Sequence, residues 1–234
     1  MTPAITEIAE KATVRLIPTA YYKPPVLRPL VDDEAELELL AAFEGMTNQR
    51  LKAESEGLDD LDPRELAFRA RADRLRRWGH TYINAAFTHT RPTGNRFNDG
   101  RRGAWYCAFD EMTALHEVAF HRTRELTYIG VFEDEAVYSA LLADFIGEFP
   151  DLRAVDPPPD CLRPEPEIGY PAGQALALQL REDGHAGLIY PSVRHAGGVC
   201  FVAFVPQIIQ NVRPAGRWRL VWDGSPDFTV IGDA

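Results

Sequence analysis

The sequence has no apolar run long enough to cross a membrane. None of its stretches approaches the roughly 18 consecutive apolar residues that a membrane-spanning helix needs. The first residues, Met1 to Glu7, do not combine a basic region with an apolar run, so we expect no signal peptide. Membrane insertion and secretion are therefore not expected.

Cysteine is scarce, and basic residues do not predominate. Cys107, Cys161 and Cys200 are odd in number and widely spaced, which argues against a disulfide framework and a CxxC metal site and indicates a reducing cytoplasm. A formal net charge of −10 argues against direct nucleic-acid binding, because phosphate contacts need a basic face. The arginines between Arg64 and Arg77 are interpreted as a solvated helix face, with a docking surface for an acidic partner as the alternative.

The pattern of helix and strand signals predicts a single α+β domain over residues 1–234. A strand and helices over residues 13–80 precede a core with a mixed sheet over residues 81–222. Capping and breaking residues predict five helices. One begins at Asp32–Asp33, and the others run from Asp62 to Trp78 before Gly79, from Asp110 to His121, from Asp134 to Ile146, and from Gly173 to Glu182. Apolar runs predict strands at residues 13–18, 104–109, 126–132, 187–190, 199–205 and 217–222, and seven prolines predict a loop from Pro150 to Pro171.

The densest group of informative residues lies between Arg91 and Glu117. A loop with Gly94 and Gly100 allows close approach of the backbone to a ligand, and Arg96 within it offers a planar guanidinium for a phosphate or carboxylate. Tyr106 follows in an apolar strand, and Glu117 in a helix. We expect an arginine, an aromatic surface and a carboxylate in one cleft, although each residue is also compatible with an ordinary structural role.

Two enzyme motifs are considered and rejected. His116 and His121 are five residues apart, which places them about 140° apart around a helix, so they do not form the zinc-protease pair; no metal is expected. Ser192 ends a predicted strand, and His195 follows it, but there is no GxSxG elbow or marked oxyanion site. Ser192 is either an ordinary turn residue or a hydrogen-bond donor to a ligand.

The order of these residues resembles the RES domain, a family named for an arginine, a glutamate and a serine. The resemblance rests on Arg15 in VRLIP, Arg96 in GNRFNDG, Tyr106 in AWYCA, Glu117 in TALHE and Ser192 in GLIYPSVR. It departs from the family's GGRWN pattern at the loop, which here reads GNRFN. About eighty residues separate Arg15 from Arg96, more than the family usually has, and this leaves Arg91 as a competitor for the first family arginine.

The resemblance implies a fold similar to ADP-ribosyltransferases and an enzyme that acts on NAD. RES proteins of this kind are toxins of toxin–antitoxin pairs, held inactive by an Xre-type helix-turn-helix antitoxin, and a homodimer within that complex is compatible with the resemblance. Arg15 and Arg96 would then neutralise the pyrophosphate, Tyr106 would stack on nicotinamide or its ribose, and Ser192 would hold that ribose. Glu117 would stabilise the positive charge that develops as nicotinamide leaves.

Three functional hypotheses follow. The first is a cytoplasmic NAD glycohydrolase or phosphorylase, with water or phosphate as the acceptor of the ADP-ribosyl group. The second is an ADP-ribosyltransferase that modifies a specific protein. The third is a non-catalytic module whose cleft binds a partner.

Overall fold

Seven strands and four α-helices make up the regular structure of the described residues in the computed structural model. The structure describes residues 3–21, 49–58, 60–66 and 78–232. The strands are β1 (Ala4–Pro18), β2 (Trp105–Ala108), β3 (Glu133–Asp151), β4 (Gly187–Pro191), β5 (Val199–Ala203), β6 (Gln210–Asp223) and β7 (Phe228–Gly232). The helices are α2 (Gln49–Glu56), α3 (His80–Thr88), α4 (Glu111–Ile129) and α5 (Pro166–Glu182). This mixture confirms the predicted α+β fold class.

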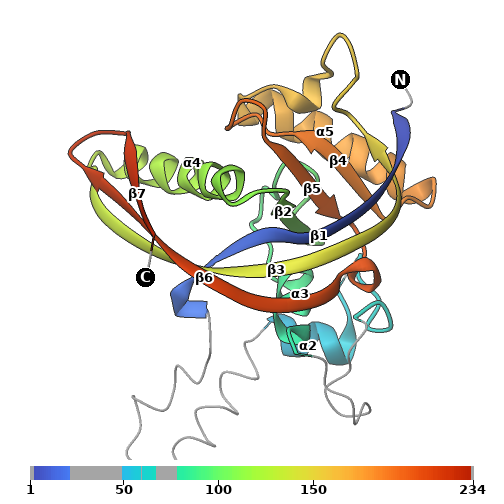
Figure 1. The fold of residues 1–234 in the computed structure, drawn as a ribbon. Coiled ribbons are helices and arrows are strands. Elements are labelled where there is room, and N and C mark those ends of the chain that lie inside the picture. The colour runs from blue at the N-terminus through green and yellow to red at the C-terminus, as the bar shows by residue number, and fades with distance from the viewer. Residues whose placement is uncertain (1–2, 22–48, 59, 67–77, 233–234) are drawn as a thin grey trace, which may run out of the picture.

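One strongly curved sheet links all seven strands, in the order β1-β2-β5-β4-β3-β6-β7 (Figure 1). β1 also pairs with β3, so β1, β2, β5, β4 and β3 form a closed circuit of pairings. The long β1–β3 ladder shifts register between Glu10 and Thr13, where Ala12 has a φ of 69° and its N–H donates to Asp144 Oδ1 at 2.9 Å. A positive φ at a β-bulge bends the strand, which suits the curvature of this sheet.

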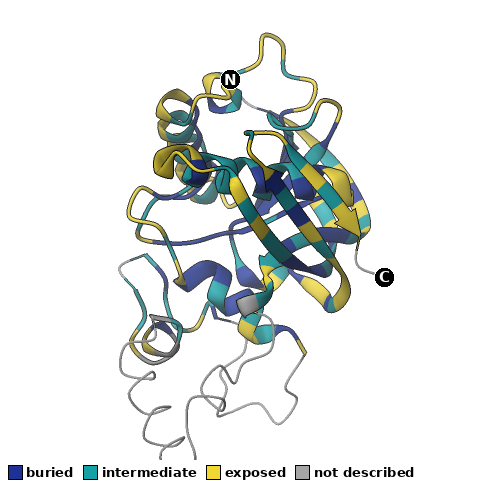
Figure 2. Cartoon of the chain, turned by 90° about the vertical axis from the view of Figure 1, so that its left-hand side faces the viewer, coloured by how far each residue is buried: buried dark blue, intermediate teal, exposed yellow. Residues whose placement is uncertain are grey.

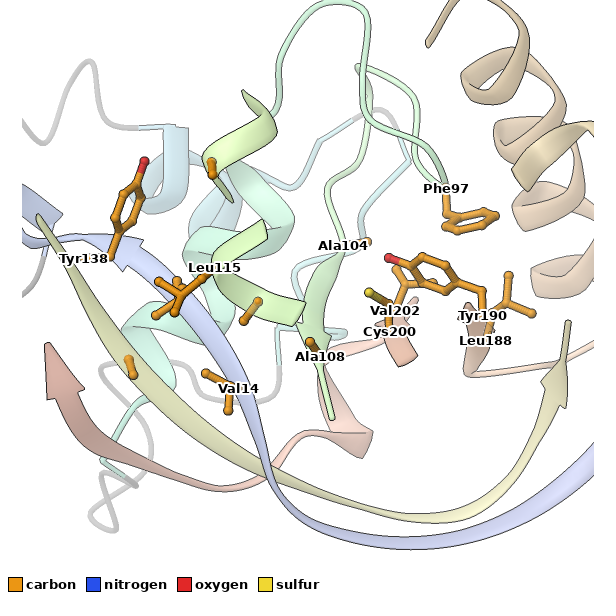
Figure 3. Close-up of a cluster of buried hydrophobic side chains, with 14 of the residues drawn as sticks. Val14, Phe97, Ala104, Ala108, Leu115, Tyr138, Leu188, Tyr190, Cys200 and Val202 are labelled. Atoms are coloured by element: carbon orange, nitrogen blue, oxygen red, sulfur yellow. The ribbon is translucent and has the colours of Figure 1, made fainter. Parts of the chain in front are cut away.

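Each face of the sheet carries its own apolar core. Along β4, Leu188 and Tyr190 belong to one core and Ile189 to the other, as the two-residue period of a strand requires. The first core packs under α4 and α5 (Figure 3), and the second packs against α2 and α3 on the opposite side (Figures 1 and 2). With both faces covered, the central strands carry apolar side chains at successive positions rather than alternating with polar ones.

Helix α4 begins where the sequence predicts but continues two turns further. The side chain of Asp110 accepts a hydrogen bond from Thr113 N at 2.8 Å, and Gly130, with a φ of 76°, ends the helix. The predicted strand at residues 126–132 is therefore wrong. Leu126 is buried against the first core, and this tertiary contact outweighs the β-propensity of the tyrosine, isoleucine and valine that follow.

The predicted helix from Asp134 to Ile146 is also wrong, because this segment lies within β3. Ladders with β1 on one side and β6 on the other satisfy its backbone groups. Side chains of β3 are buried on both faces, for example Ala140 in the first core and Leu141 in the second. Burial on both faces hides the alternation that identifies a strand in a sequence.

Other expectations fail in part. Helix α5 begins at Pro166 rather than Gly173, so the end of the predicted proline-rich loop is helical, with a proline in the first turn. Gly79, which the sequence predicts to follow a helix, also precedes helix α3. Helix α3 and strand β7 are not predicted from the sequence. The N-terminal part contains the 15-residue strand β1 and is not mainly helical over its described residues.

Two predicted helices fall wholly or mostly outside the described residues. These are the helix after Asp32–Asp33 and residues 67–77 of the helix after Asp62; the described residues 63–66 form turns and a bend. No helix among the described ranges is long and apolar enough to cross a membrane. Location in the cytoplasm remains a prediction.

Candidate functional site

A cavity of about 740 Å³ opens beside α4, between β1, β2 and the loop that carries Arg96. Ligand sites in proteins commonly enclose about 300–1,000 Å³, so its size suits a small-molecule ligand. Four predicted site residues line it: Arg15, Arg96, Tyr106 and Glu117. The fifth, Ser192, does not line the cavity but donates a hydrogen bond to Glu117, which does. The structure thus brings together residues that are up to 177 positions apart in the chain.

Glu117 projects from the second turn of α4, and one of its carboxylate oxygens has defined partners. Ser192 Oγ donates a hydrogen bond to Glu117 Oε1 at 2.6 Å, and Cys200 Sγ donates to the same atom at 3.6 Å. Among the described residues, none donates a hydrogen bond to Glu117 Oε2. The carboxylate is therefore oriented by one oxygen, and the other is available to a ligand in the cavity.

Ser192 is held in a tight turn at the end of β4. Its hydroxyl oxygen accepts hydrogen bonds from Arg194 N at 3.1 Å and His195 N at 3.0 Å, so its proton is directed to Glu117. The turn is fixed to α4 one helical turn before Glu117, where His195 Nδ1 and Thr113 Oγ1 lie 2.8 Å apart. Ser192 is thus a turn residue and the main partner of Glu117. A hydrogen bond from Ser192 to a ligand stays a prediction.

Arg96 lies beneath the first turns of α5 and is buried. Its Nη1 donates to the carbonyl oxygens of Cys161 at 2.7 Å and Arg163 at 2.8 Å, which orients the guanidinium toward the cavity. Two helical glycines permit this approach. A Cβ at Gly169 would lie 2.5 Å from Arg96 Nη1, and one at Gly173 would lie 2.1 Å from the Arg96 carbonyl oxygen. These glycines act as positioning residues for Arg96, and sequence reasoning missed them.

Tyr106 supports the loop through its hydroxyl group. The hydroxyl donates to Asn98 Oδ1 at 2.8 Å and accepts from Phe97 N at 2.9 Å, and burial raises the pKa of Tyr106 well above its usual value. Gly94, with a φ of 67°, closes the same loop on itself, because a Cβ there would lie 2.1 Å from Asn98 O. Gly94 is therefore required by the close approach of the loop to itself. The sequence suggested instead that this glycine allows a ligand to approach the backbone.

Arg15 and Arg91 both line the cavity but differ in their surroundings. Arg15 Nη1 donates to Tyr106 O at 3.0 Å, its guanidinium lies 4.8 Å from the centre of the Trp105 ring, and burial lowers its pKa to about 10. No carboxylate of the described chain pairs with it. Arg91 is exposed and forms an ion pair with Glu125 at 3.0 Å. Arg15 is half-buried, and a cation withdrawn from solvent without an acidic partner is the better candidate for binding an anion.

His116 and His121 of α4 lie in different environments. The ring of His116 stacks on His195 at 4.7 Å between centres, whereas His121 faces the cavity. They do not converge, in agreement with the helical geometry. Within the ranges that the structure describes, no three His, Cys, Asp or Glu side chains are grouped so as to hold a metal ion.

Arg194 and Cys200 also belong to the cavity lining, and sequence reasoning assigned neither. Arg194 follows Ser192 by two residues in the quoted motif, so its proximity to Ser192 was available as a signal. Cys200 and Phe201 are neighbours on β5, so their side chains point to opposite faces of the sheet. The two-residue period of the strand could therefore have placed Cys200 on the face that carries the cavity.

Comparison with known proteins identifies the family. A model of the RES domain matches residues 52–223, a range that includes Arg96, Tyr106, Glu117 and Ser192 but begins after Arg15. The chain is also similar to the uncharacterized protein y4oC of Sinorhizobium fredii (strain NBRC 101917 / NGR234), with 26% identity over 215 residues, 90% of this chain and 83% of that protein. Because the match spans most of the chain and contains the glutamate and serine of the candidate site, the chain belongs to the RES domain family.

Proposed function

We propose that the chain binds NAD in the cavity and breaks the bond between nicotinamide and ribose. The observation that carries this proposal is the Glu117 carboxylate, fixed by Ser192 at 2.6 Å and facing a cavity lined by Arg15 and Arg96. Neither arginine pairs with a carboxylate of the described residues, so an anionic ligand would supply the missing charge. Family membership supports the same conclusion, because the RES domain is associated with enzymes that act on NAD.

The chemistry needs one carboxylate and placement of the substrate. The C1′–N1 bond breaks, its electron pair stays on the nicotinamide nitrogen, and positive charge develops on the ribose. Glu117 Oε2 would bind a ribose hydroxyl and stabilise this charge, while Ser192 keeps Oε1 in place. The acceptor, water or phosphate, then forms a bond to C1′ and releases a proton to solvent.

The biological role follows from the family resemblance. We infer a toxin of a toxin–antitoxin pair whose partner is an Xre-type helix-turn-helix antitoxin. The likeness to the ADP-ribosyltransferase fold and a homodimer within the complex remain predictions. So does the solvated helix face of the arginines from Arg64 to Arg77, with a docking surface for an acidic partner as the alternative.

The test is the intracellular NAD concentration after brief induction of three forms of the chain: wild type, Glu117→Gln and Glu182→Gln. Glu182 is exposed at the end of α5 and serves as the matched control. We expect wild type and Glu182→Gln to deplete NAD and Glu117→Gln to leave it unchanged, with depletion prevented by co-expression of the antitoxin. Growth arrest with normal NAD would indicate transfer of ADP-ribose to a protein, and unchanged growth and NAD in all three would indicate a binding module.

A further inference from the structure

The turn that follows β4 is tied to helix α4 through the side chain of His195. Its ring nitrogen Nδ1 lies 2.8 Å from Thr113 Oγ1, and Thr113 is fully buried in the first turn of α4. The backbone N–H of His195 donates to Ser192 Oγ at 3.0 Å. His195 therefore links the start of α4 to the serine that holds Glu117, although it does not itself line the cavity.

The direction of the hydrogen bonds fixes which ring nitrogen of His195 carries a proton. Thr113 has one hydroxyl proton, and this hydroxyl donates at 2.7 Å to Oδ2 of Asp110, the N-cap residue of α4. An ionised carboxylate only accepts hydrogen bonds, so the proton of this bond comes from Thr113. Thr113 Oγ1 is then an acceptor toward His195, and the bond between them requires a proton on Nδ1. The geometry thus defines a relay from Asp110 through Thr113 to His195.

The ring of His195 is also held across its plane. His116 stacks on it with 4.7 Å between ring centres and 4° between ring planes. His116 in turn makes a T-shaped contact at 5.3 Å with Phe228 of β7, the strand beside α4 (Figure 1). Thr113 and His116 are three residues apart, so their side chains are neighbours on the surface of α4. One residue of the helix therefore fixes Nδ1 of the imidazole, and the other fixes its face.

Gly198 permits the contact between Thr113 and His195. A Cβ at this position would clash with Thr113 Oγ1 and would lie 3.1 Å from His195 Nδ1. The φ of Gly198 is not positive, in contrast to the 79° of Gly197, so the backbone conformation alone does not require a glycine there. The missing side chain instead allows the turn to approach the helix closely. The turn is closed by bonds from Ser192 N to Gly198 O at 2.8 Å and from Gly198 N to His195 O at 3.0 Å.

These contacts form a circuit that contains the hydrogen bond between Ser192 and Glu117. Glu117 follows Thr113 by four residues, which places both side chains on one face of α4. The circuit runs from Thr113 to His195, along the turn to Ser192, and from Ser192 Oγ back to Glu117 Oε1 at 2.6 Å. A shift of the His195 ring would therefore move Ser192 relative to the carboxylate that it orients.

We propose that His195 is a positioning residue for the cleavage of NAD, with its Nδ1–H held by Thr113 and Asp110. His195 acts through Ser192 on Glu117 and does not contact the substrate. The proposal rests on the proposed function for the reaction, but the position of the ring proton can be measured without turnover. The relay needs a hydrogen-bond donor at Nδ1 and not a basic imidazole, so an amide N–H at the same position should replace the ring.

Two pairs of substitutions with similar shapes separate the hydrogen bond from packing. His195→Asn keeps an N–H near the position of Nδ1, whereas His195→Leu does not. Thr113→Ser keeps the hydroxyl group, whereas Thr113→Val does not. We expect His195→Leu and Thr113→Val to lower the kcat of nicotinamide release by roughly 3- to 10-fold, the range that corresponds to one neutral hydrogen bond, with little change in KM for NAD. His195→Asn and Thr113→Ser should retain most of the wild-type kcat.

A double variant and a second histidine provide the controls. Combined His195→Leu and Thr113→Val should be no slower than the slower single variant, because both changes remove the same bond. His185→Leu is the matched control, since His185 lies between α5 and β4 and does not line the cavity. Thermal unfolding shows that each variant is folded. Equal kcat values for His195→Asn and His195→Leu would overturn the proposal.

Nuclear magnetic resonance of the His195 ring nitrogens tests the relay independently of activity. Nitrogen-15 spectra distinguish a protonated from an unprotonated ring nitrogen. At about pH 8, the proton should be on Nδ1 in wild type and Thr113→Ser, and on Nε2 in Thr113→Val, because the hydrogen-bond partner selects the tautomer. A wild-type Nδ1 without a proton would overturn the proposal.

The two measurements together separate this proposal from the proposed function. Nicotinamide release that is the same in wild type and all four single variants would refute the positioning role alone. The expected ring protons in a wild-type chain that releases no nicotinamide would support the relay and refute the proposed function alone.

Discussion

Substitution of Gly173 by alanine tests whether α5 positions Arg96. A Cβ at this position would lie 2.1 Å from the Arg96 carbonyl oxygen, against a minimum near 3.0 Å for real Cβ contacts, so helix or loop must move by about 1 Å. Alanine is normally favoured over glycine inside a helix by about 1 kcal/mol. Overpacking of this kind costs about 1–3 kcal/mol and is aggravated here by backbone on both sides. The clash should therefore outweigh the gain in helix propensity.

The expected result is a less stable and less active protein. A net loss of about 1–2 kcal/mol corresponds to a fall in Tm of roughly 2–8 °C for a domain of this size. Displacement of Arg96 by about 1 Å should reduce the rate of nicotinamide release by up to about 100-fold. Thermal unfolding and nicotinamide release measure the two effects, with Gly216→Ala as control because a Cβ there meets nothing within 4 Å. A Gly173→Ala protein that melts above the wild type with full activity would show that α5 does not position Arg96.

Three further predictions concern single contacts. Ser192→Ala removes the hydrogen bond to Glu117 and should lower kcat by roughly 10- to 100-fold with less effect on KM; steady-state kinetics would contradict this if only KM changed. Arg102→Met removes bonds to two backbone carbonyl oxygens and the Glu65 carboxylate, and should lower the free energy of unfolding in urea by at least about 2 kcal/mol; wild-type stability would contradict it. Hydrogen bonding to Arg122 lowers the pKa of Asp134 below its unfolded value of about 4, so the pair stabilises the fold above that pH and loses this contribution as pH falls through the folded-state pKa. Asp134→Asn should therefore flatten the stability profile below about pH 4, and an unchanged acid profile would refute this assignment.

Local signals predicted the parts of the fold that depend on local interactions. The Asp110 cap, the end of α5 near Gly184 and the strands β4 and β5 are close to their predicted positions. Each has a capping residue, a glycine or a short apolar run that acts over a few residues. The spacing within the cluster from Arg91 to Glu117 led us to expect Arg96, Tyr106 and Glu117 in one cleft, and all three line the cavity.

Non-local pairing explains what the sequence could not reveal. The sequence predicts a helix from Asp134 to Ile146, within β3, because the pairing of β3 with β1 joins residues more than one hundred positions apart and its two buried faces conceal the strand period. The same limit applies to the site. Nothing local to Gly169 and Gly173 shows that Arg96 packs against them, and nothing near Arg194 shows that it lies over Phe120.

The most direct test of the central claim is release of nicotinamide from NAD by the purified chain. Wild type, Glu117→Gln and Glu182→Gln are compared at equal concentration after thermal unfolding has shown that each is folded. We expect release by wild type and Glu182→Gln, and a loss of roughly 100-fold or more with Glu117→Gln, in line with removal of one charge-stabilising group from an active site. Equal release by Glu117→Gln and wild type would contradict the assignment of the chemistry to this carboxylate.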